Sequence, residues 1–177
     1  ISYVSSAGAA VTAFRVEGIG QSVEARCAAL CAMFAPHGNV EELHSMNSRQ
    51  FWREIRDVAP FAGDVRALWR ISLPPTTGAR LISTVCASLV SEAYFDWAGG
   101  LVWLAVAAGE DAGAAVVRSA VAALGGHATL LRAPGDIRSV VPVFQPPAPA
   151  IAALSARLKE GFDPTGVLNP GRMYAEV

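Results

Sequence analysis

The sequence has little of several features that would place it in a functional class at once. Its 14 basic residues are balanced by 15 acidic ones, so the net charge of −1 provides no positive field for nucleic acid. It has only three cysteines, an odd number that cannot all pair with one another, and this favours a reducing compartment. These shortages argue against a nucleic-acid-binding protein and against a disulfide-stapled domain.

Long apolar runs are also missing. The longest, over residues 81–90 and 101–108, are shorter than the roughly 20 residues that a membrane-spanning helix needs. Cys27 and Cys31 lie four residues apart on an expected helix, and a packing role suits them better than a metal site because Cys86 is the only other thiol. No serine lies in a nucleophile-elbow motif. We therefore expect no transmembrane segment, no bound metal and no serine-hydrolase chemistry.

Apolar residues, by contrast, are abundant enough to form a core, at 53% of the chain against 16% charged. Segments with the two-residue period of strands and segments with the period of helices follow one another. Strands are predicted over residues 11–17, 68–73, 93–97, 101–106 and 127–132. Helices are predicted over residues 21–34, 48–58, 81–90 and 111–124, with a final one from about 151 to 162. The pair Gly99 and Gly100 is typical of a hairpin between two of the strands.

This order of elements matches a ferredoxin-like βαββαβ unit with helical insertions, so we predict an α+β fold with an antiparallel sheet. Residues 1–135 would form this cap-type domain. The five prolines between residues 134 and 149 predict an extended connector, which would lead to the final helix and an ordered tail. Residues 136–177 would therefore form a separate segment.

The C-terminal segment carries the most informative pattern. Ile151, Leu154, Leu158 and Phe162 fall on one stripe of the final helix, which predicts that this face is packed. Asp163-Pro164 should end the helix, because the residue before a proline is pushed out of the helical region. Thr165-Gly166 and Asn169-Pro170-Gly171 then predict two turns, and a glycine at the second allows a positive φ. Two fixed turns near a chain end indicate a docked tail.

The tail, GFDPTGVLNPGRMY over residues 161–174, resembles the C-terminal signature of the vanillyl-alcohol-oxidase-type FAD flavoproteins. Within them it is most similar to the FAD-binding subunits of bacterial glycolate oxidase. The motifs LWRISLPP (residues 68–75), GGLVWL (99–104) and GGHATLLR (125–132) extend this similarity over most of the chain. The similarity covers only the C-terminal part of such a subunit.

The resemblance implies a ferredoxin-like cap domain whose tail returns to a preceding FAD domain. It also implies a complex with a homologous flavin subunit and an iron–sulfur subunit, which oxidises glycolate and D-lactate to the 2-oxo acid. The location implied is cytoplasmic, with peripheral contact at the inner membrane face. The chain itself has no glycine loop for a dinucleotide, since Gly18-Ile19-Gly20 lacks the third glycine, so FAD would be held mainly by the missing N-terminal domain.

Five residues are candidates for chemistry or cofactor contact. His127 follows two glycines at a helix-to-strand junction and could act as a base, although the glutamate and second histidine of related oxidases are absent here. Arg70 lies opposite the apolar side of its strand and could bind a carboxylate or face the flavin. The resemblance implies cofactor contacts from Asn169, Gly171 and Arg172. Each candidate also has a purely structural interpretation.

Two other functional hypotheses remain open. The chain could belong to an assembly module of the complex that no longer needs flavin. It could instead belong to an independent FAD-dependent oxidase that acts on its own substrate with His127 and Arg70. The flavin content of the full-length subunit, and its turnover of glycolate when purified alone, would separate these hypotheses.

Overall fold

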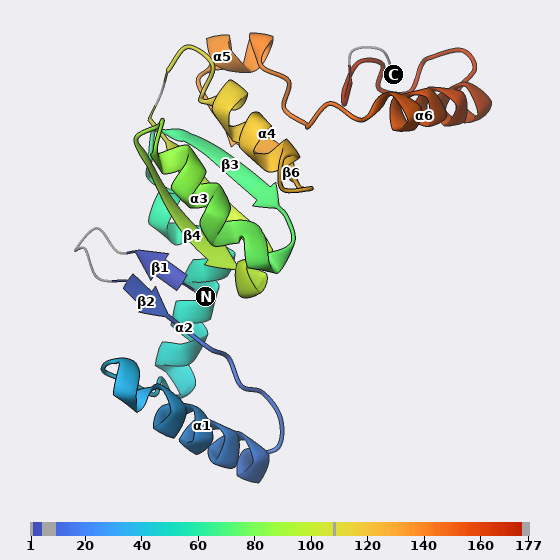
Figure 1. Ribbon diagram of the computed structural model, residues 1–177. Coiled ribbons are helices and arrows are strands. Elements are labelled where there is room, and N and C mark those ends of the chain that lie inside the picture. The colour runs from blue at the N-terminus through green and yellow to red at the C-terminus, as the bar shows by residue number, and fades with distance from the viewer. Residues whose placement is uncertain (1, 5–9, 108, 175–177) are drawn as a thin grey trace. The chain divides into compact units, whose positions relative to one another are not determined.

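Figure 1 shows the computed structural model of the chain, which describes residues 2–4, 10–107 and 109–174. The chain forms two compact units. The smaller unit comprises residues 12–64, and the larger comprises residues 1–11 together with 65–177. The predicted division at residue 135 stays a prediction.

The larger unit is built around an antiparallel sheet with two helices against it (Figure 1). Its main elements are β3 (Ala67–Ser72), α3 (Gly78–Cys86), β4 (Ser91–Asp96), β5 (Leu101–Val106), α4 (Ala114–Ala122) and β6 (His127–Arg132). Two short strands, β1 (Ser2–Val4) and β2 (Ala10–Thr12), extend the sheet in the order β2-β1-β4-β5-β3-β6. The α+β class with an antiparallel sheet is confirmed, and the six main elements follow one another in the predicted βαββαβ order.

Side chains of β3 alternate between the two faces of the sheet, as the pleat of a strand requires. Trp69 and Ile71 are fully buried on the face that α3 and α4 cover. Arg70 and Ser72 therefore point to the opposite face, which we call the second face, and both are half-buried there. The core on the helical side is completed by Leu81, Val85, Val102, Leu104, Val117, Val121 and Leu130.

One end of the sheet depends on very close backbone approaches. A Cβ added to Gly126 would lie 2.5 Å from the Ser72 carbonyl oxygen, and one added to Gly99 would lie 2.5 Å from that of Pro75. These distances are far shorter than any contact a real Cβ makes, so only glycine allows the chain segments to meet. Gly126 of the GGHATLLR motif and Gly99 of the GGLVWL motif therefore have a steric role at this end of the sheet.

The smaller unit contains the helices α1 (Gly20–Phe34) and α2 (Ser45–Arg56), with short 3-10 turns at Ala35–His37 and Ala59–Phe61. The rings of Phe14 and Phe34 stack with centroids 4.8 Å apart. The Arg15 guanidinium lies 5.8 Å from the centroid of the Trp52 ring. Both predicted helices are present, and the second begins and ends slightly earlier than residues 48–58.

The strand predicted over residues 11–17 is wrong beyond Thr12. Only Ala10–Thr12 is in the sheet, because the chain passes from one compact unit to the other at this point. The alternation that suggested a strand continues through Arg15 and Glu17, whose side chains pair with each other. Alternation alone cannot make a strand where no neighbouring strand completes the ladder.

The helix predicted over residues 81–90 is α3, which begins earlier, at Gly78, and also ends earlier, at Cys86. The amide groups of Ser88 and Leu89 donate to the Val85 carbonyl oxygen at 3.0 and 2.9 Å, closing a turn that leads into β4. The helix predicted over residues 111–124 spans only Ala114–Ala122. Its N-terminal turn is capped by Asp111, whose carboxylate accepts bonds from the amides of residues 113 and 115 at 2.9 Å.

The connector predicted to be extended contains a short helix, α5 (Gly135–Val140). Pro134 precedes its first residue and Asp136 lies in its first turn, where a negative charge is favourable. The prolines therefore frame this helix at both ends and do not interrupt it. The connector continues along β6, where the Leu130 amide donates to the Val143 carbonyl oxygen at 2.9 Å.

We predict that Gly126→Ala lowers the free energy of unfolding by about 1–3 kcal/mol, because the new methyl group must displace the backbone at Ser72. Gly135→Ala is the matched control, since nothing lies within 4 Å of its added Cβ. Urea unfolding of both variants tests this. Equal stability of the two variants would show that the approach of Gly126 to β3 is not required.

Candidate functional site

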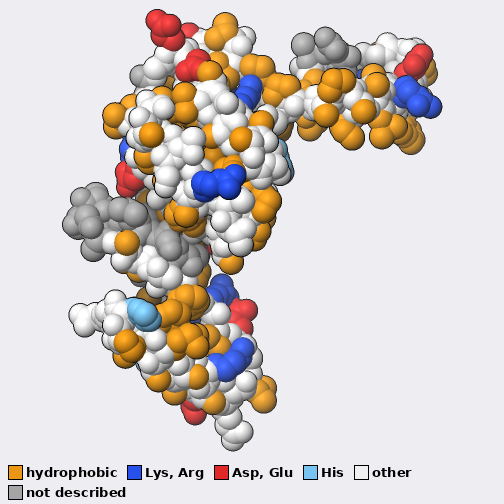
Figure 2. Space-filling model, in the orientation of Figure 1, with side chains coloured by type: hydrophobic (Ala, Val, Ile, Leu, Met, Phe, Trp, Pro, Cys, Tyr) orange, Lys and Arg blue, Asp and Glu red, His pale blue; other side chains and the backbone are white. Residues whose placement is uncertain are grey.

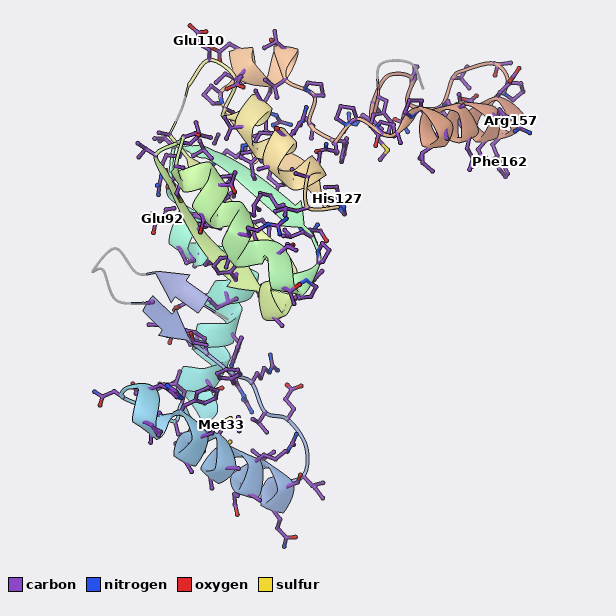
Figure 3. The ribbon with its side chains drawn as sticks, in the orientation of Figure 1. Met33, Glu92, Glu110, His127, Arg157 and Phe162 are labelled. Atoms are coloured by element: carbon purple, nitrogen blue, oxygen red, sulfur yellow. The ribbon has the colours of Figure 1, made fainter. Side chains whose placement is uncertain are left out.

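The sheet register brings both predicted catalytic candidates to the second face. On β3 and β6, Arg70 lies opposite Thr129, and Ser72 lies opposite His127. Arg70 and His127 are therefore diagonal neighbours on adjacent strands, an arrangement whose Cα atoms typically lie about 7–8 Å apart. His127 is exposed at the beginning of β6 (Figure 3).

The Arg70 guanidinium is held by an aromatic ring. Its central carbon lies 5.6 Å from the centroid of the Trp97 ring, within the range of a cation–π contact. Within the described part of the chain, the Arg70 side chain makes no hydrogen bond and no ion pair. Nearby Arg66, in contrast, pairs with Glu92 at 2.9 Å. Arg70 therefore has guanidinium donors that no described residue takes up and that could bind a ligand.

Trp97 is a site residue that the sequence motifs did not single out. Its side chain is 60% exposed. It begins a 3-10 turn, Trp97–Gly99, in which Trp97, Ala98 and Gly99 have φ values of 51°, 54° and 92°. A positive φ is rare for a bulky residue, and the Asp96 carboxylate supports it by accepting a bond from the Trp97 amide at 2.7 Å. A lone tryptophan before Ala-Gly-Gly was the available signal.

His127 lacks the partners that orient a general base. No hydrogen bond or ion pair to its imidazole is present among the described residues. A catalytic histidine ordinarily has one ring nitrogen fixed by a carboxylate or carbonyl. The position of His127 beside Ser72 suits a hydrogen-bonding role toward a ligand better than proton abstraction.

The last helix, α6 (Pro149–Phe162), bears the predicted apolar stripe, but the stripe is exposed. Phe162 at its end is 85% exposed, and the packed face that we predicted is not observed within the described residues. Figure 2 shows hydrophobic side chains along this helix, and Figure 3 labels Phe162 and Arg157 on it. Amphipathic spacing predicted the helix correctly without specifying what covers its apolar face.

Asp163 organises the tail that follows α6. Its carboxylate accepts bonds from the amides of Val167 and Leu168 at 3.1 and 2.9 Å, and from the Lys159 ammonium at 2.6 Å. The residue is buried, and the bond from Lys159, followed by those from the backbone, lowers the pKa of its carboxyl. The predicted turn after Pro164 is thus built around one buried, paired charge.

The three predicted cofactor contacts lie together in the second turn of the tail. Asn169 and Gly171 have φ values of 49° and 65°, and the Arg172 amide donates to the Asn169 carbonyl oxygen at 3.2 Å. The Arg172 side chain is exposed, and it makes no ion pair within the described residues. The turn therefore presents a cation on a defined backbone, and whether it contacts a cofactor stays a prediction.

In the described part of the chain, no group of three or more His, Cys, Asp or Glu residues is arranged to hold a metal ion. No described helix is long and apolar enough to cross a membrane.

We predict that Asp163→Asn speeds hydrogen exchange of the Val167 and Leu168 amides by roughly tenfold or more, because hydrogen bonds to a charged acceptor are about twice as strong as those to a neutral one. Folding lowers the pKa of the Asp163 carboxyl. The stabilisation of the tail by this carboxylate is therefore present above the ordinary carboxyl pKa of about 4, and it is lost as the pH falls through the pKa of the folded state. Exchange measured from pH 7 to pH 3, corrected for intrinsic rates, tests both statements. Exposed Glu160→Gln is the control, and equal exchange in the two variants would contradict the role of Asp163.

Comparison with known proteins agrees with the sequence motifs. Over 129 residues, or 72% of the chain, the sequence is 38% identical to glycolate oxidase subunit GlcE of Escherichia coli (strain K12). The matched part spans 32% of that relative's length, so the chain corresponds to about a third of it. No protein-family model matches the chain, and no solved structure matches it significantly. The predicted resemblance to a glycolate oxidase subunit is therefore confirmed as a similarity over most of this chain.

Proposed function

We propose that the chain is the C-terminal, ferredoxin-like cap domain and tail of a glycolate oxidase FAD-binding subunit. The observation that carries this proposal is the 38% identity to glycolate oxidase subunit GlcE over 72% of the chain. The tail signature and the βαββαβ order of elements support it. The complex would oxidise glycolate, and D-lactate as well, to the corresponding 2-oxo acid.

FAD is the cofactor implied, and it would accept the two electrons removed from the 2-hydroxy acid. The described residues suit a contact with its anionic part, because Arg172 is an exposed cation on a turn held by Asn169 and Gly171. They do not suit the whole dinucleotide, since the chain lacks a glycine loop whose amides could surround the pyrophosphate. We therefore assign most FAD binding to a preceding domain of the subunit, onto which the tail docks.

The partners implied by the resemblance are a homologous flavin subunit and an iron–sulfur subunit that receives the electrons. We place the main substrate chemistry on the homologous subunit, because His127 has neither the neighbouring glutamate nor the second histidine of related oxidases. This subunit would then serve in FAD binding, electron transfer or assembly, in the cytoplasm at the inner membrane face. A flavin-free full-length subunit that still supports complex activity would favour the assembly-module alternative.

The 177-residue chain alone should bind FAD weakly or not at all. The cofactor's charged half would find no organised amide donors in it. Fluorescence titration with FAD tests this, with the full-length subunit as the positive control. A stoichiometric, tight complex with the chain alone would contradict the assignment of the cofactor to a preceding domain.

In the full-length subunit, Arg172→Ala should reduce flavin retention far more than His127→Ala reduces glycolate turnover by the complex. The turn already restricts the backbone at Arg172, and a charge-assisted contact contributes about 1.5–3 kcal/mol, or roughly tenfold or more in affinity. Flavin occupancy and complex activity are measured for both variants. Arg157→Ala on exposed α6 is the control. If Arg172→Ala keeps its flavin while His127→Ala abolishes turnover, the proposed division of roles is wrong.

A further inference from the structure

Four neighbouring polar side chains on the second face have hydrogen-bonding groups that no described residue takes up. They are Arg70 and Ser72 of β3, and His127 and Thr129 of β6. The register places them as two directly opposed pairs, Arg70 with Thr129 and Ser72 with His127. All are half-buried except His127, which is exposed. Half-buried polar groups are ordinarily satisfied within the protein or by a ligand or water.

The chemistry of this group is that of an anion site. Arg70 supplies a planar guanidinium with five donors, which matches the two oxygens of a carboxylate. Ser72 and Thr129 add hydroxyl groups that can donate to an oxygen of the ligand or accept from its hydroxyl group. On the next strand, half-buried Trp103 lies opposite Arg70 and offers an apolar wall to a small carbon skeleton.

Trp97 restricts where the guanidinium can lie. Its ring is 5.6 Å from the guanidinium carbon, although Trp97 remains 60% exposed and the Arg70 donors stay free of protein partners in the described chain. Residues held in positive φ ordinarily cost about 1–3 kcal/mol, and they persist where surrounding structure supports them. Here the Asp96 carboxylate and the contact between Gly99 and Pro75 supply that support.

We propose that Arg70, Ser72 and Thr129 bind the carboxylate of a small 2-hydroxy or 2-oxo acid on the second face, and that Trp97 is the positioning residue for the Arg70 guanidinium. This inference rests on the proposed function for the class of acid. It adds a binding site within the chain itself, separate from the tail. A bidentate contact with Arg70 selects a planar carboxylate, and a stacked guanidinium loses less freedom when it binds one.

Isothermal titration of the full-length subunit with glycolate tests the site, with ethylene glycol as the analogue that lacks a carboxylate. We expect the subunit to bind glycolate but not ethylene glycol. The Arg70→Gln variant should bind glycolate at least tenfold more weakly than the wild type. Arg70→Lys should also lose most of the affinity, because it keeps the charge without the planar fork. Arg138→Gln is the matched control, since Arg138 is exposed on α5. Melting temperatures of all variants check that they are folded.

The role of Trp97 has its own readout. Trp97→Ala should weaken glycolate binding several-fold. Trp97→Phe should keep most of the wild-type affinity, because the phenyl ring can still stack on the Arg70 guanidinium. Inorganic phosphate should compete poorly with glycolate, since the site is argued to suit a planar acid. Preferred binding of phosphate, or equal loss in Trp97→Ala and Trp97→Phe, would overturn the geometry proposed.

Failure of this inference can be told apart from failure of the proposed function. If glycolate does not bind, or binds equally to wild type and Arg70→Gln, the second-face site is refuted even when the complex oxidises glycolate. If Arg70-dependent binding is present but the complex neither holds flavin nor oxidises glycolate, the site stands and the proposed function fails. Binding is measured by isothermal titration calorimetry, so neither result depends on turnover.

Discussion

The two-residue alternation along β3 is the constraint on which both faces of the sheet depend. β3 lies between β5 and β6, and its register with β5 is continuous from Ala67 to Ser72. A slip of one residue would move Arg70 into the core and Trp69 out of it. Burying an unpaired guanidinium costs several kcal/mol, and the Trp69 indole would lose its bond to the Ala112 carbonyl oxygen at 2.9 Å. The stable core therefore also aims Arg70 at the second face.

Close backbone packing connects this core to the candidate site. Gly126 meets the Ser72 carbonyl at the beginning of β6, and Gly99 meets the Pro75 carbonyl at the turn that carries Trp97. Neither contact leaves room for a side chain. The beginning of β6 therefore cannot shift without displacing the end of β3, and the turn that carries Trp97 cannot shift without displacing the backbone at Pro75. His127 and Trp97, each next to or near one of these glycines, take their positions from the same packing. A site made from strand residues and a rigid turn is better defined than one on a free loop.

Sequence periodicity predicted most elements because each has its own local signal. The strand at 127–132 agrees with β6 at both ends, and the glycine pair correctly marked the β4–β5 connection. The residues after Thr12 alternate like a strand, yet they leave the sheet at a boundary between compact units that periodicity does not reveal. Trp97 was missed because its role depends on a left-handed backbone and on Arg70, 27 positions earlier in the sequence. The tail turns were predictable, but the part played by Asp163 as their acceptor required the structure.

We propose two separate tasks for the chain, acid binding on the second face and cofactor contact by the tail. The first of these tasks requires that the Arg70 guanidinium, which has no hydrogen-bond or ion-pair partner among the described residues, binds a carboxylate. A crystal structure of the full-length subunit with FAD and glycolate tests this most directly. We expect the glycolate carboxylate at hydrogen-bond distance, about 2.7–3.2 Å, from the Arg70 guanidinium while Trp97 remains stacked on it. Glycolate bound elsewhere, with Arg70 paired to a carboxylate of the protein, would contradict it.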